Sequence, residues 1–231
     1  MAGNEWSVAV VEEPPLEPQH TTLFARDWGV PWHAHILPAG LALLMLAIWI
    51  FAGDQVAVAW ALSRHSIESG LILTLILHMF AHGGLLHVLM NVAALLLLSG
   101  PLISRLGRPP LSWARYSYLF IGSGLSGAAA FLLLNRDPSV SVLGASGAIF
   151  GLVAALARVN PTTGNAVDLR SQRTWLLVKF FIQNHLALFV FLAIMALASG
   201  RWVGLAWEAH LGGLLFGFFA TPFYLIRDAG K

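Results

Sequence analysis

The chain has 231 residues, of which 58% are hydrophobic and only 10% are charged, and its formal net charge is +2. Soluble domains carry about 25% charged residues, so this chain lacks the polar surface that a water-soluble fold needs. The absence of cysteine excludes disulfides and thiolate chemistry, and no basic cluster indicates a nucleic-acid partner. The composition therefore predicts an all-α polytopic membrane protein.

The first 34 residues are predicted to form a mostly flexible cytoplasmic tail. They carry five acidic residues against the single basic residue Arg26, and they contain the sequence PPLEP. They lack the charged start and short apolar core of a cleavable signal peptide. The membrane domain is therefore expected over residues 35–231.

Six apolar segments in this domain are long enough to cross a bilayer, which takes about 17–25 residues per helix. Their approximate bounds are Ile36–Ala52, Leu85–Leu102, Trp113–Leu134, Leu143–Val159, Trp175–Ala198 and Val203–Ile226. The run from Gly70 to Gly100 is too long for one ordinary span, and Gly83-Gly84 interrupts it. Residues 56–82 are therefore predicted to be a loop with short interfacial helical pieces.

The distribution of Lys and Arg predicts the orientation, because cytoplasmic loops carry an excess of both. With the N-terminus in the cytoplasm, ten of the 13 basic residues fall on the cytoplasmic side. The opposite side then holds only Arg64, Arg136 and Arg201. Both termini are therefore expected in the cytoplasm.

Polar residues inside the spans are candidates for function, since burying them in lipid is costly. Four stand out: His87 and Asn91 in the second segment, Ser146 in the fourth and His210 in the sixth. Counted along the helix to the nearest cytoplasmic arginine, Asn91, Ser146 and His210 lie about 21, 18 and 25 Å deep. Three separate segments thus place polar groups at a similar level, in the half of the membrane away from the cytoplasm.

Small residues predict that the fourth and sixth segments touch. A GxxxG pair lets two membrane helices approach closely. Such pairs are Gly147 and Gly151 on the fourth segment and Gly213 and Gly217 on the sixth. A close approach through them would bring the Ser146 hydroxyl within reach of the His210 imidazole.

Simpler interpretations exist for several of these residues. A serine between glycines can be a packing residue, and His185 in the fifth segment is expected to be a hydrogen-bonded packing histidine. His78, His82 and His87 could suggest a metal site, but no carboxylate accompanies them and the Gly-Gly break separates His87 from the others. No metal is therefore predicted.

Three motifs together resemble the rhomboid family of intramembrane serine proteases. They are HMFAHGGLLHVLMN at 78–91, GASG at 144–147 and AHLGGLLFG at 209–217. The resemblance covers about Leu37–Ile226 and implies a six-helix bundle with a short central fourth helix. It implies Ser146 as nucleophile and His210 as general base.

The same resemblance implies supporting roles near the serine. His87 and Asn91 would assist an oxyanion hole, and Gly144 would shape the turn before Ser146. Phe150 stands where the family often has a tyrosine that packs on the catalytic histidine. A Trp-Arg pair common in the first loop of the family is replaced by LILTLILH at 71–78.

The implied activity is hydrolysis of peptide bonds in or near transmembrane segments of membrane-protein substrates, by a Ser-His dyad without a cofactor. Glu208 lies two residues before His210 on a different helical face, so no acid completes a triad. The expected setting is a bacterial inner membrane, with the site open to the non-cytoplasmic side. The alternative is a catalytically inactive rhomboid-like protein that binds transmembrane helices. A transporter or channel is disfavoured, because charged relay residues and paired broken helices are missing from the sequence.

Overall fold

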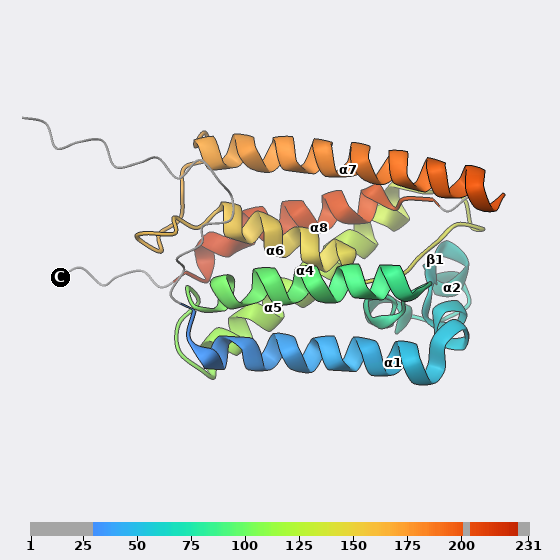
Figure 1. Ribbon diagram of the computed structural model, residues 1–231, viewed down its shortest axis with the longest axis horizontal. Coiled ribbons are helices and arrows are strands. Elements are labelled where there is room, and N and C mark those ends of the chain that lie inside the picture. Colours follow the sequence, from blue (N-terminus) through green and yellow to red (C-terminus); the bar gives the residue numbers. More distant parts are fainter. Residues whose placement is uncertain (1–29, 201–203, 226–231) are drawn as a thin grey trace, which may run out of the picture.

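The computed structural model describes residues 30–200 and 204–225, and it is mostly helical. Within these residues, the helices of 12 or more residues are α1 (Ile36–Trp60), α4 (Leu85–Ile103), α5 (Leu111–Leu134), α6 (Ser146–Ala157), α7 (Gln172–Ser199) and α8 (Trp207–Ala220). They lie side by side and run alternately in opposite directions, with α1 and α7 on the two outer sides of the view in Figure 1.

Four segments of this bundle are long and apolar enough to cross a membrane, namely Trp32–Gly53, Leu85–Ile103, Leu111–Leu134 and Gln172–Ala198. The remaining two helices, α6 and α8, have 12 and 14 residues. Every residue of α6 from Gly147 to Ala157 is buried. The chain is therefore an all-α membrane protein whose described residues contain four candidate spans and a short buried helix, and the expected number of six spans stays a prediction.

Several boundaries differ from the predicted segments; α7, for example, begins at Gln172 rather than Trp175. Element α1 consists of two helical pieces joined by a kink at Gly53, whose φ of 37° and ψ of −124° are non-helical, so the first piece ends next to the predicted bound Ala52 and a second piece, which was not predicted, runs on to Trp60. Glycine tolerates this positive φ because it has no Cβ. Helix α6 begins at Ser146 rather than Leu143, and α8 begins at Trp207 rather than Val203. The predicted end at Ile226 lies outside the described residues.

The connection between α1 and α4 contains short helical pieces, as expected. They are α2 (Arg64–Glu68), α3 (Thr74–Leu77) and the 3-10 turn η2 (His78–Phe80). A two-residue strand β1 (Leu62–Ser63) precedes them and pairs antiparallel with β2 (Ser141–Val142), so that Leu62 faces Val142. The sequence analysis did not predict this pairing. It ties the first loop to the segment that enters α6.

The predicted tail ends earlier than residue 34. Trp32–His35 form a 3-10 turn, η1, and Ala34 is fully buried. Val30 packs against the main core, beside Gly100 of α4. Residues 30–34 are therefore part of the helical domain, and the rest of the predicted tail lies outside the described residues.

Helices α6 and α8 touch through backbone at the positions of the predicted glycine pairs. A Cβ on Gly213 would overlap the carbonyl oxygen of Gly147, and a Cβ on Gly217 would overlap that of Gly151. Helix α5 packs against the same two helices, and its Ser126 hydroxyl donates to the Gly212 carbonyl oxygen at 2.9 Å. The three helices thus form the tightest part of the bundle, which fixes the relative positions of α6 and α8.

Candidate active site

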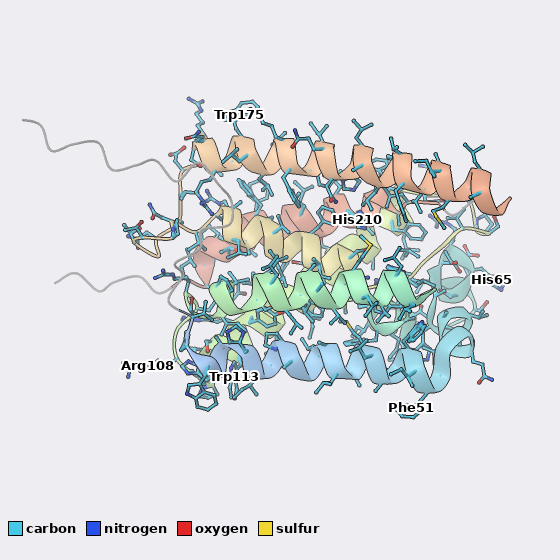
Figure 2. All side chains as sticks on the ribbon, in the orientation of Figure 1. Phe51, His65, Arg108, Trp113, Trp175 and His210 are labelled. Atoms are coloured by element: carbon cyan, nitrogen blue, oxygen red, sulfur yellow. The ribbon has the colours of Figure 1, made fainter. Side chains whose placement is uncertain are left out.

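The first residue of α6 and a residue in the first turn of α8 form a hydrogen bond. Ser146 Oγ lies 2.8 Å from His210 Nε2. Ser146 is half-buried, while His210 is only 4% exposed. Figure 2 shows His210 inside the bundle, well away from the end that carries Arg108, Trp113 and Trp175. The structure therefore places the hydroxyl and the imidazole in direct contact, in the interior of the protein.

An aromatic ring holds the imidazole from one side. Phe150, one turn after Ser146 on α6, stacks on His210 with ring centroids 4.4 Å apart and an interplanar angle of 29°. Phe150 is itself buried, and it also contacts Phe181 of α7. The packing restricts the orientation of the His210 ring.

A second histidine, His185 of α7, contacts the other nitrogen of His210. His185 Nε2 lies 2.9 Å from His210 Nδ1, and His185 Nδ1 lies 2.8 Å from the carbonyl oxygen of Phe181. The sequence analysis placed His185 among packing residues and missed this contact. A depth count gives only its level: His185 follows Arg173, an arginine that the sequence analysis assigned to the cytoplasmic side, by 12 residues, about 18 Å along a helix, which is the depth obtained for Ser146, but the count does not give the direction of the side chain.

Helix α7 touches the bundle along a narrow stripe. Of its side chains that the structure describes, only Arg173, Leu177 and His185 are buried. With Phe181 they follow a four-residue spacing, which places them on one face. The remaining faces carry exposed apolar side chains. His185 is therefore one of few anchors between α7 and the rest of the protein.

Arg173 acts at the opposite end of α6. Its Nη2 donates to the carbonyl oxygen of Leu156 at 3.0 Å and its Nε to that of Ala157 at 3.4 Å. The last carbonyl groups of a helix lack intrahelical donors, and a cation there interacts favourably with the helix dipole. Helix α7 thus engages both ends of α6, through Arg173 and, by way of His210, through His185.

The N-terminal end of α6 offers backbone donors beside the serine. Because Ser146 is the first residue of the helix, its N–H has no intrahelical acceptor. Gly144, two residues earlier, has φ 106° and donates its N–H to the His78 carbonyl oxygen at 2.7 Å. This left-handed turn lets the chain enter α6 with the Ser146 hydroxyl directed at His210.

His87 and Asn91 of α4 lie against this turn. A Cβ on Gly144 would stand 2.6 Å from His87 Nε2 and 3.5 Å from Asn91 Nδ2. Asn91 is buried, and its Nδ2 donates to the His87 carbonyl oxygen at 3.1 Å. His87 and Asn91 therefore lie next to the turn before Ser146, and their role in an oxyanion hole stays a prediction.

Two further histidines, His78 and His82, lie in the loop that precedes α4. The ring of His82 meets that of His87 edge to face, with centroids 5.1 Å apart. Burial, together with the neighbouring His87, lowers the pKa of His82 to about 4, so its ring is neutral near pH 7. His78 Nδ1 donates to the Thr74 carbonyl oxygen at 2.9 Å. Across residues 30–200 and 204–225, no group of three or more potential ligands is placed to hold a metal ion.

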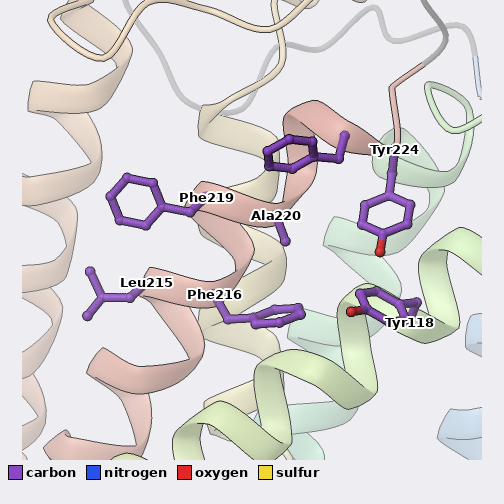
Figure 3. Close-up of a pocket in the computed structure, with 7 residues that line it drawn as sticks. Tyr118, Leu215, Phe216, Phe219, Ala220 and Tyr224 are labelled. Atoms are coloured by element: carbon purple, nitrogen blue, oxygen red, sulfur yellow. The ribbon is translucent and has the colours of Figure 1, made fainter.

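A separate groove lies further along α8. It is lined by aromatic residues of α5 and α8, including Tyr118 and Phe216, and by Tyr224 beyond η3 (Thr221–Phe223). Figure 3 shows the rings of Phe216, Tyr118 and Tyr224 on one side of α8 and that of Phe219 on the other. Phe216 follows His210 by six residues, about 9 Å along the helix, so this groove is distinct from the Ser146 site.

Comparison with known proteins agrees with this geometry. The Rhomboid domain matches residues 69–227, which include both helices that carry the serine and the histidine. RHOMBOID-like protein 5 of Arabidopsis thaliana is 28% identical over 167 residues, which are 72% of this chain and 48% of that protein. RHOMBOID-like protein 1 of the same plant is 32% identical over 146 residues, 63% of this chain and 33% of that protein.

The chain thus spans about half or less of the length of these curated relatives. The domain match, in contrast, covers well over half of the chain. It also includes the later part of the loop that precedes α4, from residue 69, and the turn at Gly144. The chain belongs to the rhomboid family.

Proposed function

We propose that this protein is an intramembrane serine protease that hydrolyses peptide bonds in or near transmembrane segments of membrane proteins. The observation that carries the proposal is the 2.8 Å contact between Ser146 Oγ and His210 Nε2 inside an apolar bundle. A serine hydroxyl is a weak nucleophile until an adjacent base takes its proton. An imidazole 2.8 Å away meets the geometric condition for that transfer.

The chemistry follows from the groups around the serine. As Ser146 Oγ attacks the scissile carbonyl carbon, its proton passes to His210 Nε2, and the carbonyl oxygen becomes an oxyanion. The N–H of Ser146 and the side chains of His87 and Asn91 stabilise that charge. His210 then gives the proton to the leaving amine, and water hydrolyses the acyl-enzyme with His210 again as base.

The substrate is proposed to be a transmembrane helix that unwinds near the cleavage point, because the hydrogen bonds of an intact helix hide its peptide bonds. Small residues at the cleavage point and helix-weakening residues beside it fit this requirement. We further propose a site open to the non-cytoplasmic side and both termini in the cytoplasm. The bacterial inner membrane stays a prediction.

The test uses the full chain in detergent or liposomes with a single-span substrate that contains glycine or proline near its outer end. Wild type is expected to cleave it and to be labelled by a fluorophosphonate at Ser146. Ser146→Ala and His210→Gln are expected to lose both. Ser123→Ala is the matched control, since Ser123 is a buried serine of α5 whose hydroxyl has no partner among the described residues.

Two outcomes would contradict the proposal. Cleavage that persists in Ser146→Ala would rule out this serine as nucleophile. Folded wild type that binds the transmembrane substrate, without cleavage or labelling, would favour the alternative of an inactive rhomboid-like protein that binds transmembrane helices.

A further inference from the structure

The hydrogen bonds of His185 define the tautomer of two histidines. A carbonyl oxygen can only accept a hydrogen bond, so the proton in the 2.8 Å contact with Phe181 must reside on His185 Nδ1. A neutral imidazole carries one N–H. His185 Nε2 is then an acceptor.

This acceptor determines the state of His210. Because His185 Nε2 accepts, the 2.9 Å contact requires the proton on His210 Nδ1. His210 Nε2 is then left with a free lone pair, and it faces the Ser146 hydroxyl at 2.8 Å. The hydrogen bonds run in one direction, from Ser146 through His210 and His185 to the Phe181 carbonyl oxygen.

We propose that His185 is a positioning residue for His210, so that the site works as a Ser-His-His series rather than an isolated dyad. The inference rests on the proposed protease function. The neutral His185 ring takes the place that a carboxylate has in a serine-protease triad, where the third residue fixes the tautomer and orientation of the base. His185 thereby holds the His210 ring with the basic nitrogen, Nε2, directed at the Ser146 hydroxyl.

The proton count during acylation is consistent with this role. The proton of Ser146 moves to His210 Nε2 as the Oγ–carbon bond forms, which makes His210 an imidazolium with N–H groups on both nitrogens. The Nδ1–H of that imidazolium still donates to His185 Nε2. His185 therefore stabilises the positive charge through its lone pair, and no proton moves to His185. His210 returns to its neutral state when Nε2 protonates the leaving amine.

Other contacts keep His185 in place. Its ring lies 4.0 Å from that of Phe181 and 5.1 Å from that of Phe150, measured between centroids. His185 is 7% exposed. Phe150 thus packs on both histidines, so the two imidazoles and the phenyl ring form one packed unit. Without an acceptor at position 185, His210 could adopt the opposite tautomer, which points an N–H at the serine and cannot take its proton.

The kinetic test compares three variants of α7. His185→Leu removes the acceptor, His185→Gln places an amide oxygen near the position of Nε2, and Gln183→Leu makes a similar polar-to-apolar change at an exposed position of the same helix. His185→Leu is expected to lower kcat and the fluorophosphonate labelling rate about 10- to 100-fold, with KM little changed. His185→Gln is expected to recover most of that loss, and Gln183→Leu to match wild type.

A purely structural role for His185 predicts a different pattern. In that case both His185 variants would have a lower melting temperature than wild type, and their kcat per folded molecule would be unchanged. That pattern, or an equal loss of kcat in His185→Leu and His185→Gln, would overturn the inference.

A spectroscopic measurement tests the tautomer without any need for activity. The full chain is labelled with ¹⁵N-histidine, and the His210 signals are identified by their loss in His210→Gln. Wild type is expected to carry the proton of His210 on Nδ1, and His185→Leu to shift it toward Nε2. A wild-type proton on Nε2 would overturn the inference even for an active protease. If wild type is inactive, the proposed function fails, and the tautomer still decides the role of His185.

Discussion

The carbonyl oxygen of Gly147 on α6 occupies the space that a side chain on Gly213 of α8 would need. The two helices therefore meet backbone to backbone, one residue after Ser146 and three residues after His210. This contact sets the separation of the two proposed catalytic groups. A substitution that separates the two helices is therefore expected to lower the stability of the protein and to disturb the contact between Ser146 and His210.

Gly213→Ala is expected to destabilise the protein by about 1–3 kcal/mol or more, because overpacking that meets backbone cannot be relieved by a side-chain movement. It is also expected to abolish fluorophosphonate labelling. Thermal unfolding in detergent and labelling measure the two effects. Gly40→Ala on α1 is the control: no atom lies within 4 Å of the new Cβ, so stability should be unchanged or slightly raised. Equal effects in the two variants would contradict this account of the α6–α8 contact.

Gly144→Ala tests the turn that precedes the serine. The φ of 106° is strained for any residue with a Cβ, at a cost of about 1–2 kcal/mol, and the Cβ would displace the His87 ring. The labelling rate of Ser146 is therefore expected to fall by about tenfold or more, while far-UV circular dichroism stays helical. Gly83→Ala is the matched control in the neighbouring loop, since its Cβ would make only an ordinary contact with Leu143 at 3.7 Å. Undiminished labelling of Gly144→Ala would show that the turn does not position the serine.

Phe150→Leu tests the ring that stacks on His210. Aromatic pairs contribute about 0.5–1.5 kcal/mol beyond the area they bury, so the labelling rate is expected to drop by up to about tenfold. Phe120→Leu is the comparison, because Phe120 is also buried and stacks on Tyr116 of the same helix. Both variants should lose stability, but only Phe150→Leu should slow labelling per folded molecule. A similar slowing in Phe120→Leu would assign the effect to general destabilisation.

Arg173→Met tests the hydrogen bonds at the C-terminal end of α6. The change removes the guanidinium donor from the Leu156 and Ala157 carbonyl oxygens. The Leu156 oxygen still accepts from the Val159 N–H at 3.2 Å, so the expected cost, about 1–3 kcal/mol for a buried polar group left unsatisfied, falls on the Ala157 oxygen. A lower melting temperature is expected, together with faster proteolysis of the segment between α6 and α7. Arg170→Met, at an exposed position before α7, should leave both measurements unchanged. No loss of stability in Arg173→Met would show that other donors replace the guanidinium.

Hydrophobicity and small-residue spacing accounted for much of the fold. The α4 start at Leu85 and the α5 end at Leu134 agree with the predicted bounds, because Gly83-Gly84 and Asn135 interrupt apolar runs. The predicted end of the first span at Ala52 also agrees with the kink at Gly53, but the second helical piece of α1, which runs on to Trp60, could not be predicted in the same way. A glycine can end a helix or merely bend it, and the dihedral angles at Gly53 depend on what the following residues pack against.

The sequence placed Ser146 and His210 on meeting helices, but it could not indicate what lies behind His210. A histidine on an apolar helix has the same sequence pattern whether it packs against a neighbour or orients another imidazole. The difference lies in the rotation of α7 about its axis, which turns His185 and Leu177 inward. The contacts of α7 with α6 and α8 set that rotation. The periodicity of residues within α7 does not specify these contacts.

The pairing of Leu62 with Val142 joins two parts of the chain that are distant in sequence, at one end of the bundle (Figure 1). The first loop and the strand that leads to Ser146 are therefore joined by backbone pairing at two residues of each. Under the proposed function, a substrate that approaches Ser146 from that end would have to pass around the β1–β2 pair or separate its strands. In either case, the structure of the first loop would affect how a substrate reaches Ser146.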